Sequence, residues 1–416
     1  YEIFIQRISM HERRIPEWLR HAPAPSVRGF AMLAAFEAVA RGILISVFPL
    51  LMFRTLQDAQ MVSLIYFIIG ITSLIAGLLV PIVTRYLPRR WVYIVGVLMF
   101  AIGSLLAILG TATAIVIGLL LNTVAVVLTF VCFNAYVLDY ISKIELGNCE
   151  TSRMFYSALG WTVGPVLGVF LFRWWEPAPF LIATFATFGM LGMFLFMRLG
   201  NGKLIVKSIA SPTNSLAYFS KFLRRRRLVS GWTFAVVRSS GWWVYVVYLP
   251  IFAVENGLSE ELGGSLLSLT NSALFITPLM LRWIKRKSIK IAVRTGFLAS
   301  AILFILAYIT AGIPIFAVAA LMCGSFFLIL LDVSAGLPFL LAVKPSERTE
   351  MSAIYSSYRD VSGILTPGAA WIVLLFAPLN GVFALSGIAL FGAWSLAGLL
   401  HPNLGQSRIK MQAKDS

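Results

Sequence analysis

One apolar run of this chain ends in Pro81-Ile-Val-Thr-Arg85-Tyr-Leu-Pro-Arg89-Arg90. A run in the second half of the sequence ends in the same way, in Pro278-Leu-Met-Leu-Arg282-Trp-Ile-Lys-Arg286-Lys287. A further matched pair of apolar runs contains Gly164-Pro165 and Thr366-Pro367. Such a repeat predicts a bundle of two similar halves, with a binding site between them.

The composition indicates a protein that crosses a membrane many times. Of its 416 residues, 59% are hydrophobic and 12% are charged, whereas soluble domains contain about 25% charged residues. Apolar runs long enough to span a bilayer as helices recur along the chain, and the alternating pattern of a membrane barrel is absent from the sequence. We therefore expect an all-α membrane protein with twelve spans, at 28–53, 60–84, 91–110, 114–142, 153–173, 178–198, 228–252, 262–284, 292–311, 314–343, 350–376 and 379–400.

The basic residues lie almost entirely in every second loop. This pattern predicts that both termini and the central linker lie in the cytoplasm, and that the protein resides in the cell inner membrane. The net charge of +17 then reflects orientation and contact with anionic lipids, and we expect no nucleic-acid partner. The expected parts are an N-terminal segment 1–27, a six-helix bundle 28–198, a basic linker 199–227, a second six-helix bundle 228–400 and a tail 401–416.

The linker carries its basic residues without an acidic one and ends in the cluster Lys221-Phe-Leu-Arg-Arg-Arg-Arg227. We interpret it as a tether whose basic cluster faces lipid headgroups. A regulatory or partner-binding role is the alternative.

Cysteine and histidine give no sign of a metal site or a disulfide framework. Cys132, Cys149 and Cys323 are scattered, and the three histidines lie in the terminal segments. The sequence contains no phosphate-binding loop for ATP and no motif of a hydrolase or metalloprotease. We therefore expect no cofactor, no metal and no enzymatic activity.

Two groups of six spans, a basic central linker and charged loops after spans 2 and 8 resemble the major facilitator superfamily over nearly the whole chain. The loop 2–3 motif of that family reads Gly-x-x-x-Asp-Arg-x-Gly-Arg-Arg. Here the terminal basic pair, Arg89 and Arg90, is kept, but the Asp-Arg core has become Arg85-Tyr86. The resemblance implies a cytoplasmic gate, for which Arg359 is a further candidate. We expect Arg85 to pair with Asp360 or with Asp139, the alternative being that it faces lipid headgroups.

Span 5 contains a second family motif. Proton-driven antiporters of the family carry Gly-x-x-x-Gly-Pro-x-x-Gly-Gly, and this chain reads Gly160-Trp-Thr-Val-Gly164-Pro165-Val-Leu-Gly168-Val169. Small residues allow helices to approach closely, and proline bends a helix. The resemblance favours export by antiport and implies a tight contact between spans. The span-4 arginine of drug–proton antiporters has no match, since span 4 offers Asn122 and Asn134 instead.

Four charged residues lie deep within the expected spans: Glu37, Arg41, Arg238 and Asp332. Placing a charged side chain at the centre of a membrane helix costs about 2.5–3.5 kcal/mol, so we expect each of these residues to have a structural or functional role. The resemblance implies that spans 1, 4, 7 and 10 line a central cavity, and all four residues fall on these spans. Glu37 and Arg41 are four residues apart and can pair on one helix face. Aligning the two halves on Pro49 and Pro250 sets Glu37 opposite Arg238, where the two could form a gate, hold a charged substrate or make a static ion pair.

Asp332 has no basic residue within a helical turn of its own span. A carboxyl group in such a place can bind and release a proton as access alternates. We therefore predict that Asp332, with Glu37, serves proton coupling. Glu37, Arg41 and Arg238 would bind substrate or gate the cavity. The alternative is that Asp332 is simply the ion-pair partner of Arg238. Both interpretations hold if protonation of Asp332 releases Arg238.

Aromatic and amide side chains complete the predicted site. Trp242 and Trp243 lie mid-span and suggest a bulky, partly apolar substrate, while Asn122, Asn134 and Asn271 offer hydrogen bonds to substrate or between helices. We expect a monomeric secondary transporter that exports a small amphipathic or charged molecule in exchange for protons. The alternatives are proton-coupled uptake by symport and a transporter-like protein that handles a lipid or pigment.

Overall fold

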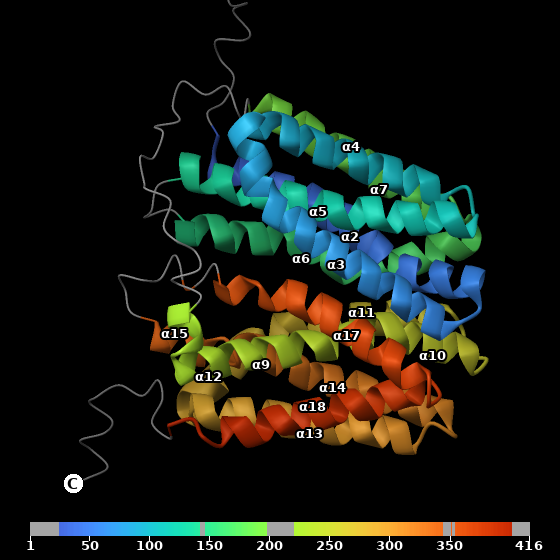
Figure 1. Ribbon diagram of the computed structural model, residues 1–416, viewed down its shortest axis with the longest axis vertical. Helices are drawn as coiled ribbons and strands as arrows, with labels where there is room; N and C mark the ends of the chain where they lie inside the picture. The colour runs from blue at the N-terminus through green and yellow to red at the C-terminus, as the bar shows by residue number, and fades with distance from the viewer. Residues whose placement is uncertain (1–24, 142–145, 198–219, 344–350, 352–353, 402–416) are drawn as a thin grey trace, which may run out of the picture.

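The computed structural model describes residues 25–141, 146–197, 220–343, 351 and 354–401. In this part of the chain every regular element is helical. Figure 1 shows two layers, with α2 to α7 in one and α9 to α18 in the other. The expected termini and most of the linker lie outside the described residues.

The first layer consists of six helices, and each corresponds to one expected span. They are α2 (Val27–Leu56), α3 (Ala59–Tyr86), α4 (Arg89–Ala107), α5 (Ala112–Tyr140), α6 (Leu146–Trp174) and α7 (Ala178–Phe196). Polar caps start three of them, since Ser26, Asp58 and Thr111 accept hydrogen bonds from the first-turn amides of α2, α3 and α5. Gln57 adopts a left-handed conformation (φ 53°) and so ends α2.

The second layer also contains six spans, but several of them are interrupted. The elements are α9 (Arg226–Trp243), η2 (Val244–Tyr248), α10 (Leu249–Glu255), α11 (Glu261–Ser272), η3 (Ala273–Ile276), α12 (Thr277–Arg286), α13 (Ile289–Ile309), α14 (Pro314–Ser334), α15 (Leu337–Ala342), α17 (Tyr358–Leu374) and α18 (Asn380–Ala397). Span 7 is interrupted by the π-helical turn η2, and span 8 is interrupted by the 3₁₀ turn η3.

The twelve-span, two-bundle fold is thus confirmed, with three differences in detail. Nine helices of the described chain are long and apolar enough to cross a membrane on their own. The interrupted spans 7 and 8 and the 17-residue α17 make up the remainder. Helix α6 starts at Leu146, before the expected boundary. Within span 10, α14 ends at Ser334, and α15 follows as a separate helix with Pro338 in its first turn.

The two faces of the molecule differ in how the layers meet. We call the end where α2 begins and α18 ends the terminal face, and the end where α2 meets α3 the opposite face. The layers pack together through α3 against α17 and α6 against α11. These contacts involve Phe67 with Gly368 and Gly264 with Pro165, all in the portions of their helices nearer the opposite face. The layers therefore close on the opposite face.

Candidate functional site

Asp332, in the last turn of α14, forms an ion pair within the second layer. Its Oδ1 atom lies 3.0 Å from Nε of Arg238, which projects from α9 toward α14. The indole nitrogen of Trp242, one turn further along α9, donates a hydrogen bond to Oδ2 at 3.0 Å. The Arg238 side chain is 10% exposed, whereas that of Asp332 is 36% exposed. The carboxylate is therefore held by two partners while one side of it stays open.

Aromatic rings of α17 and the segment before it surround this ion pair. The guanidinium of Arg238 lies over the ring of Tyr358, 5.3 Å from its centroid. Tyr355 stacks on Phe339 of α15, with ring centroids 4.0 Å apart. Neither tyrosine was predicted from the sequence. Their spacing of three residues, just before Arg359, places both on one helix face and was the available signal.

A second ion pair lies in the first layer. Nη1 of Arg41 is 3.0 Å from Oε1 of Glu37, as the four-residue spacing predicts. The guanidinium also lies over the ring of Trp161 on α6, at 5.2 Å, another residue that the sequence analysis missed. The side chains are 35% and 15% exposed, so both retain accessible surface in mid-span. Each layer thus offers an arginine–carboxylate pair, Arg41–Glu37 or Arg238–Asp332, whose arginine lies over an aromatic ring.

In the structure, Arg41 and Arg238 each pair with a carboxylate of their own layer. Arg238 lies against Asp332 and Arg41 against Glu37, whereas the sequence alignment of the halves set Glu37 opposite Arg238. Ion pairs within a layer can persist while the layers move. Neither of these two pairs joins the two layers.

The predicted amide and tryptophan residues take different positions. Asn122 is 5% exposed and lies in the α4–α5 contact, with Oδ1 3.5 Å from Ser104 Oγ, so it packs helices instead of lining a site. Asn134 accepts a hydrogen bond from Arg153 of α6 at 3.5 Å. Asn271 donates to the backbone oxygen of Trp161 at 2.6 Å and so joins the layers. Trp243 meets Tyr66 of α3, edge to face at 5.9 Å, and also lies between the layers.

The predicted gate residues form two groups near the terminal face. Arg89 donates to Asp139 at 2.6 Å, and Arg90 stacks on Trp91. Arg359 lies over the ring of Phe130 on α5, 5.6 Å from its centroid, and thus reaches across the layers. Asp360 follows Arg359 in the first turn of α17. The side chain of Arg85 lies outside the described part, and the partner that the structure gives to Asp139 is Arg89, one turn further on.

The glycine motif of span 5 lies directly on α2. A Cβ atom on Gly160, Gly164 or Gly168 would come within 2.1–2.7 Å of backbone atoms of Ala38, Gly42 or Ile43. Pro165 faces the other way, because its carbonyl oxygen would lie 2.5 Å from a Cβ atom on Gly264 of α11. The motif therefore fixes α6 against the helix that carries Glu37 and Arg41, and contacts the other layer beside it.

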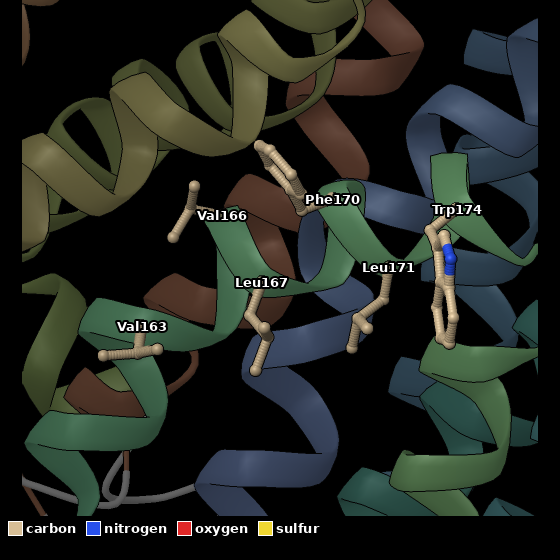
Figure 2. A pocket seen from close by; sticks show the side chains of 6 residues that line it. All are labelled: Val163, Val166, Leu167, Phe170, Leu171 and Trp174. Carbon is tan, nitrogen blue, oxygen red and sulfur yellow. The ribbon is translucent and has the colours of Figure 1, made fainter.

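The outward surface of α6 is apolar. A groove of about 430 Å³ is lined by Val163, Val166, Leu167, Phe170, Leu171 and Trp174. Figure 2 shows these six side chains along α6. No polar side chain lines it other than the indole of Trp174. This groove suits the hydrocarbon of the bilayer and has none of the groups that a charged solute would need.

On the opposite face, charged residues join the layers. Arg54, in the last turn of α2, donates through Nε to Oε1 of Glu260 at 2.6 Å and contacts its second oxygen through Nη2. Arg54 also lies 3.4 Å from Glu176, which belongs to its own layer. Arg173 of α6 pairs with Glu261 at the start of α11. We call these five residues the ionic latch.

Replacing Glu260 by Gln is expected to loosen the latch. The substitution removes the partner of Arg54 in the other layer but keeps the size of the side chain. Because such half-exposed pairs contribute up to about 1 kcal/mol, the population open on this face should rise by up to about fivefold. Electron spin resonance distances between labels at the starts of α3 and α11 would measure it in a cysteine-free background. Glu176→Gln is the matched control, and an equal change in both variants would contradict the role of the latch.

Comparisons with known proteins decide the family. A family model described as Major Facilitator Superfamily matches residues 30–367. The chain belongs to this superfamily. It is therefore a multi-pass membrane transporter, and not an enzyme.

Solved structures show the same fold at low sequence identity. The nucleoside transporter NupG has a TM-score of 0.64 and 16% identity, over 89% of this chain and 98% of that one. A mutant of peptide transporter POT in complex with alafosfalin has a TM-score of 0.71 and 14% identity, over 91% and 95%. A POT family transporter in complex with 5-aminolevulinic acid has a TM-score of 0.69 and 12% identity, over 91% of this chain and 97% of that one. No curated protein sequence matches the chain.

Proposed function

We propose that this major facilitator protein is a proton-coupled symporter of a small organic solute that carries an anionic group. One observation carries the proposal: the Asp332 carboxylate neutralises a nearly buried Arg238 while remaining partly open itself. Protonation of Asp332 would leave Arg238 as an uncompensated charge, and an uncompensated buried charge is strongly unfavourable. An anionic substrate group at Arg238 would remove that penalty.

Proton and substrate therefore favour each other's binding. In the empty site Asp332 balances Arg238, and in the loaded site the substrate anion takes over while Asp332 holds the proton. The coupling is reciprocal, since each ligand raises the affinity for the other. Trp242 orients the free carboxylate through its hydrogen bond to Oδ2.

The first layer supplies a second pair that could receive another part of the same solute. Glu37 and Arg41 are partly exposed and project from α2 beside Trp161. A solute with a cationic or hydrogen-bonding group would complete its contacts there as the layers close around it. A small polar organic solute is consistent with the structural neighbours, which include a nucleoside transporter, a peptide transporter and a POT family transporter in complex with 5-aminolevulinic acid.

The site is proposed to face the cytoplasm in this conformation. The layers are closed at the opposite face by the ionic latch and by the α3–α17 and α6–α11 contacts. The basic loops lie at the terminal face, which the positive-inside rule assigns to the cytoplasm. We also propose the cell inner membrane as its location, with both termini in the cytoplasm and the protein acting as a monomer.

Export by antiport is the second candidate, and the glycine motif of α6 favours it. Gly160, Gly164 and Gly168 pack directly on α2, as the antiporter motif of the family implies. In antiport a cationic solute would displace the proton from Asp332 instead of binding with it. The comparisons give no support for that direction.

Proteoliposomes with an imposed pH gradient test the proposal. Radiolabelled anionic, zwitterionic, cationic and neutral solutes would be offered outside, with the outside acid or the inside acid. Symport of an anion predicts accumulation of anionic or zwitterionic solutes only when the outside is acid. Accumulation of cationic solutes when the inside is acid would establish antiport and refute the proposal.

A further inference from the structure

A basic corner of the terminal face has no role in the proposed transport cycle. It comprises five residues at the end of α12 and in the first turns of α13: Arg282, Arg286, Lys287, Lys290 and Arg294. Arg282, Arg286 and Lys287 are exposed, while Lys290 and Arg294 are half-buried. Within the described chain, no carboxylate forms an ion pair with any of the five. The corner thus concentrates positive charge that no carboxylate of the described residues neutralises.

Arg294 is held in place by an aromatic ring, although no acidic residue in the part of the chain that the structure describes pairs with it. Its guanidinium lies over the indole of Trp394 on α18, 4.9 Å from the ring centroid. Its Nε atom is buried and has no hydrogen-bond partner in the described chain. Stacking of this kind orients the planar guanidinium while leaving its outer N–H groups free to bind an oxyanion. Lys290 lies one turn earlier on the same face of α13.

The surroundings of this pair match the level of lipid headgroups. Tryptophan is enriched at membrane interfaces, and Trp394 lies in the last turn of α18. Below it, Phe391 and Ile388 of α18 are 45% and 64% exposed, and Ile302 of α13 is 55% exposed. Cationic side chains at the membrane surface, with apolar side chains beneath them, suit a molecule that has both a phosphate group and hydrocarbon chains.

We propose that the corner formed by α12, α13 and α18 binds the phosphodiester of an anionic phospholipid. Arg294, held flat by Trp394, would donate to the phosphate oxygens, and Lys290 would add a second charge. Arg286 and Lys287 would strengthen the field at the rim. The acyl chains would run along Phe391 and the neighbouring surface of α13 and α18.

Native mass spectrometry of the full-length protein in detergent tests this site. The protein would be titrated with phosphatidylglycerol and, separately, with phosphatidylcholine. We expect wild type to retain phosphatidylglycerol preferentially and the double variant Lys290→Gln/Arg294→Gln to retain it about tenfold less well. Arg226→Gln/Arg227→Gln is the control, because it removes two exposed charges at the start of α9 on the same face.

A further variant and a competition with phosphate distinguish a specific lipid site from its alternatives. Arg294→Lys keeps the charge but loses the planar stack, so we expect an intermediate loss. Equal losses in the Lys290/Arg294 variant and in the control would overturn the site in favour of general attraction to the basic face. Displacement of the lipid by millimolar inorganic phosphate would show a free-anion site instead. Thermal unfolding midpoints of all variants establish that each is folded.

Discussion

Replacing Asp332 by Asn is expected to abolish accumulation driven by a pH gradient while preserving exchange of substrate across the membrane. Asparagine has the shape of aspartic acid and can still accept the hydrogen bond from Trp242, but it cannot take up a proton. Arg238 would then attract the substrate anion permanently, because no carboxylate competes with it. Loss of a step that depends on one proton acceptor should lower driven uptake at least about a hundredfold.

Counterflow in proteoliposomes separates the two activities. Preloaded liposomes report exchange, and empty liposomes with an acid exterior report driven uptake. Asp58→Asn is the matched control, since Asp58 caps α3 at the opposite face and asparagine caps equally well. Driven uptake by Asp332→Asn at the wild-type rate would refute the proton role. If the variant is poorly folded, Asp332→Asn with Arg238→Gln removes the unpaired charge, and this pair should fold but fail to bind the anion.

Replacing Gly164 by Ala is expected to destabilise the first layer severely. A Cβ atom there would lie 2.6 Å from the carbonyl carbon of Gly42 and 2.9 Å from the nitrogen of Ile43. Both are backbone atoms of a packed helix, so neither can rotate away. Overpacking of this kind costs about 1–3 kcal/mol, and it would move α2 together with Glu37 and Arg41.

The thermal unfolding midpoint in detergent measures the effect. Gly192→Ala is the control, because a Cβ atom on Gly192 would meet nothing within 4 Å. Alanine favours a helix over glycine by about 1 kcal/mol, so the control should be neutral or slightly more stable. A midpoint for Gly164→Ala equal to that of the control would mean that α2 and α6 are not in close contact in the protein.

The twelve spans could be predicted because their signals are local. Hydrophobic length defines each helix and basic loops separate them, so most boundaries fell within a few residues of the observed ones. The breaks at η2 and η3 could not be predicted. In η2, Tyr245 forms a hydrogen bond with Thr270 and Tyr248 with Ser63, and such contacts between helices leave no local pattern in the sequence.

Of the two ion pairs of the site, only one could be predicted from local spacing. Glu37 and Arg41 share one helix, so their spacing alone predicts the contact. Arg238 and Asp332 come from α9 and α14, and the sequence left their pairing as one of two alternatives. Trp161, Tyr355 and Tyr358 were missed because an aromatic residue on an apolar helix looks the same whether it faces lipid or a buried arginine.

The contacts of Arg54 affect the free energy that is needed to separate the two layers on the opposite face. It binds Glu260 in the other layer, yet Glu176 and the ring of Phe172 hold it within its own layer as well. If the layers part on the opposite face, Arg54 would keep Glu176 as a counterion, because both residues belong to the first layer. Loss of the contact with Glu260 would then carry a small net free-energy change. The inward and outward arrangements can then lie within a few kcal/mol of each other, the near-degeneracy that rapid turnover demands.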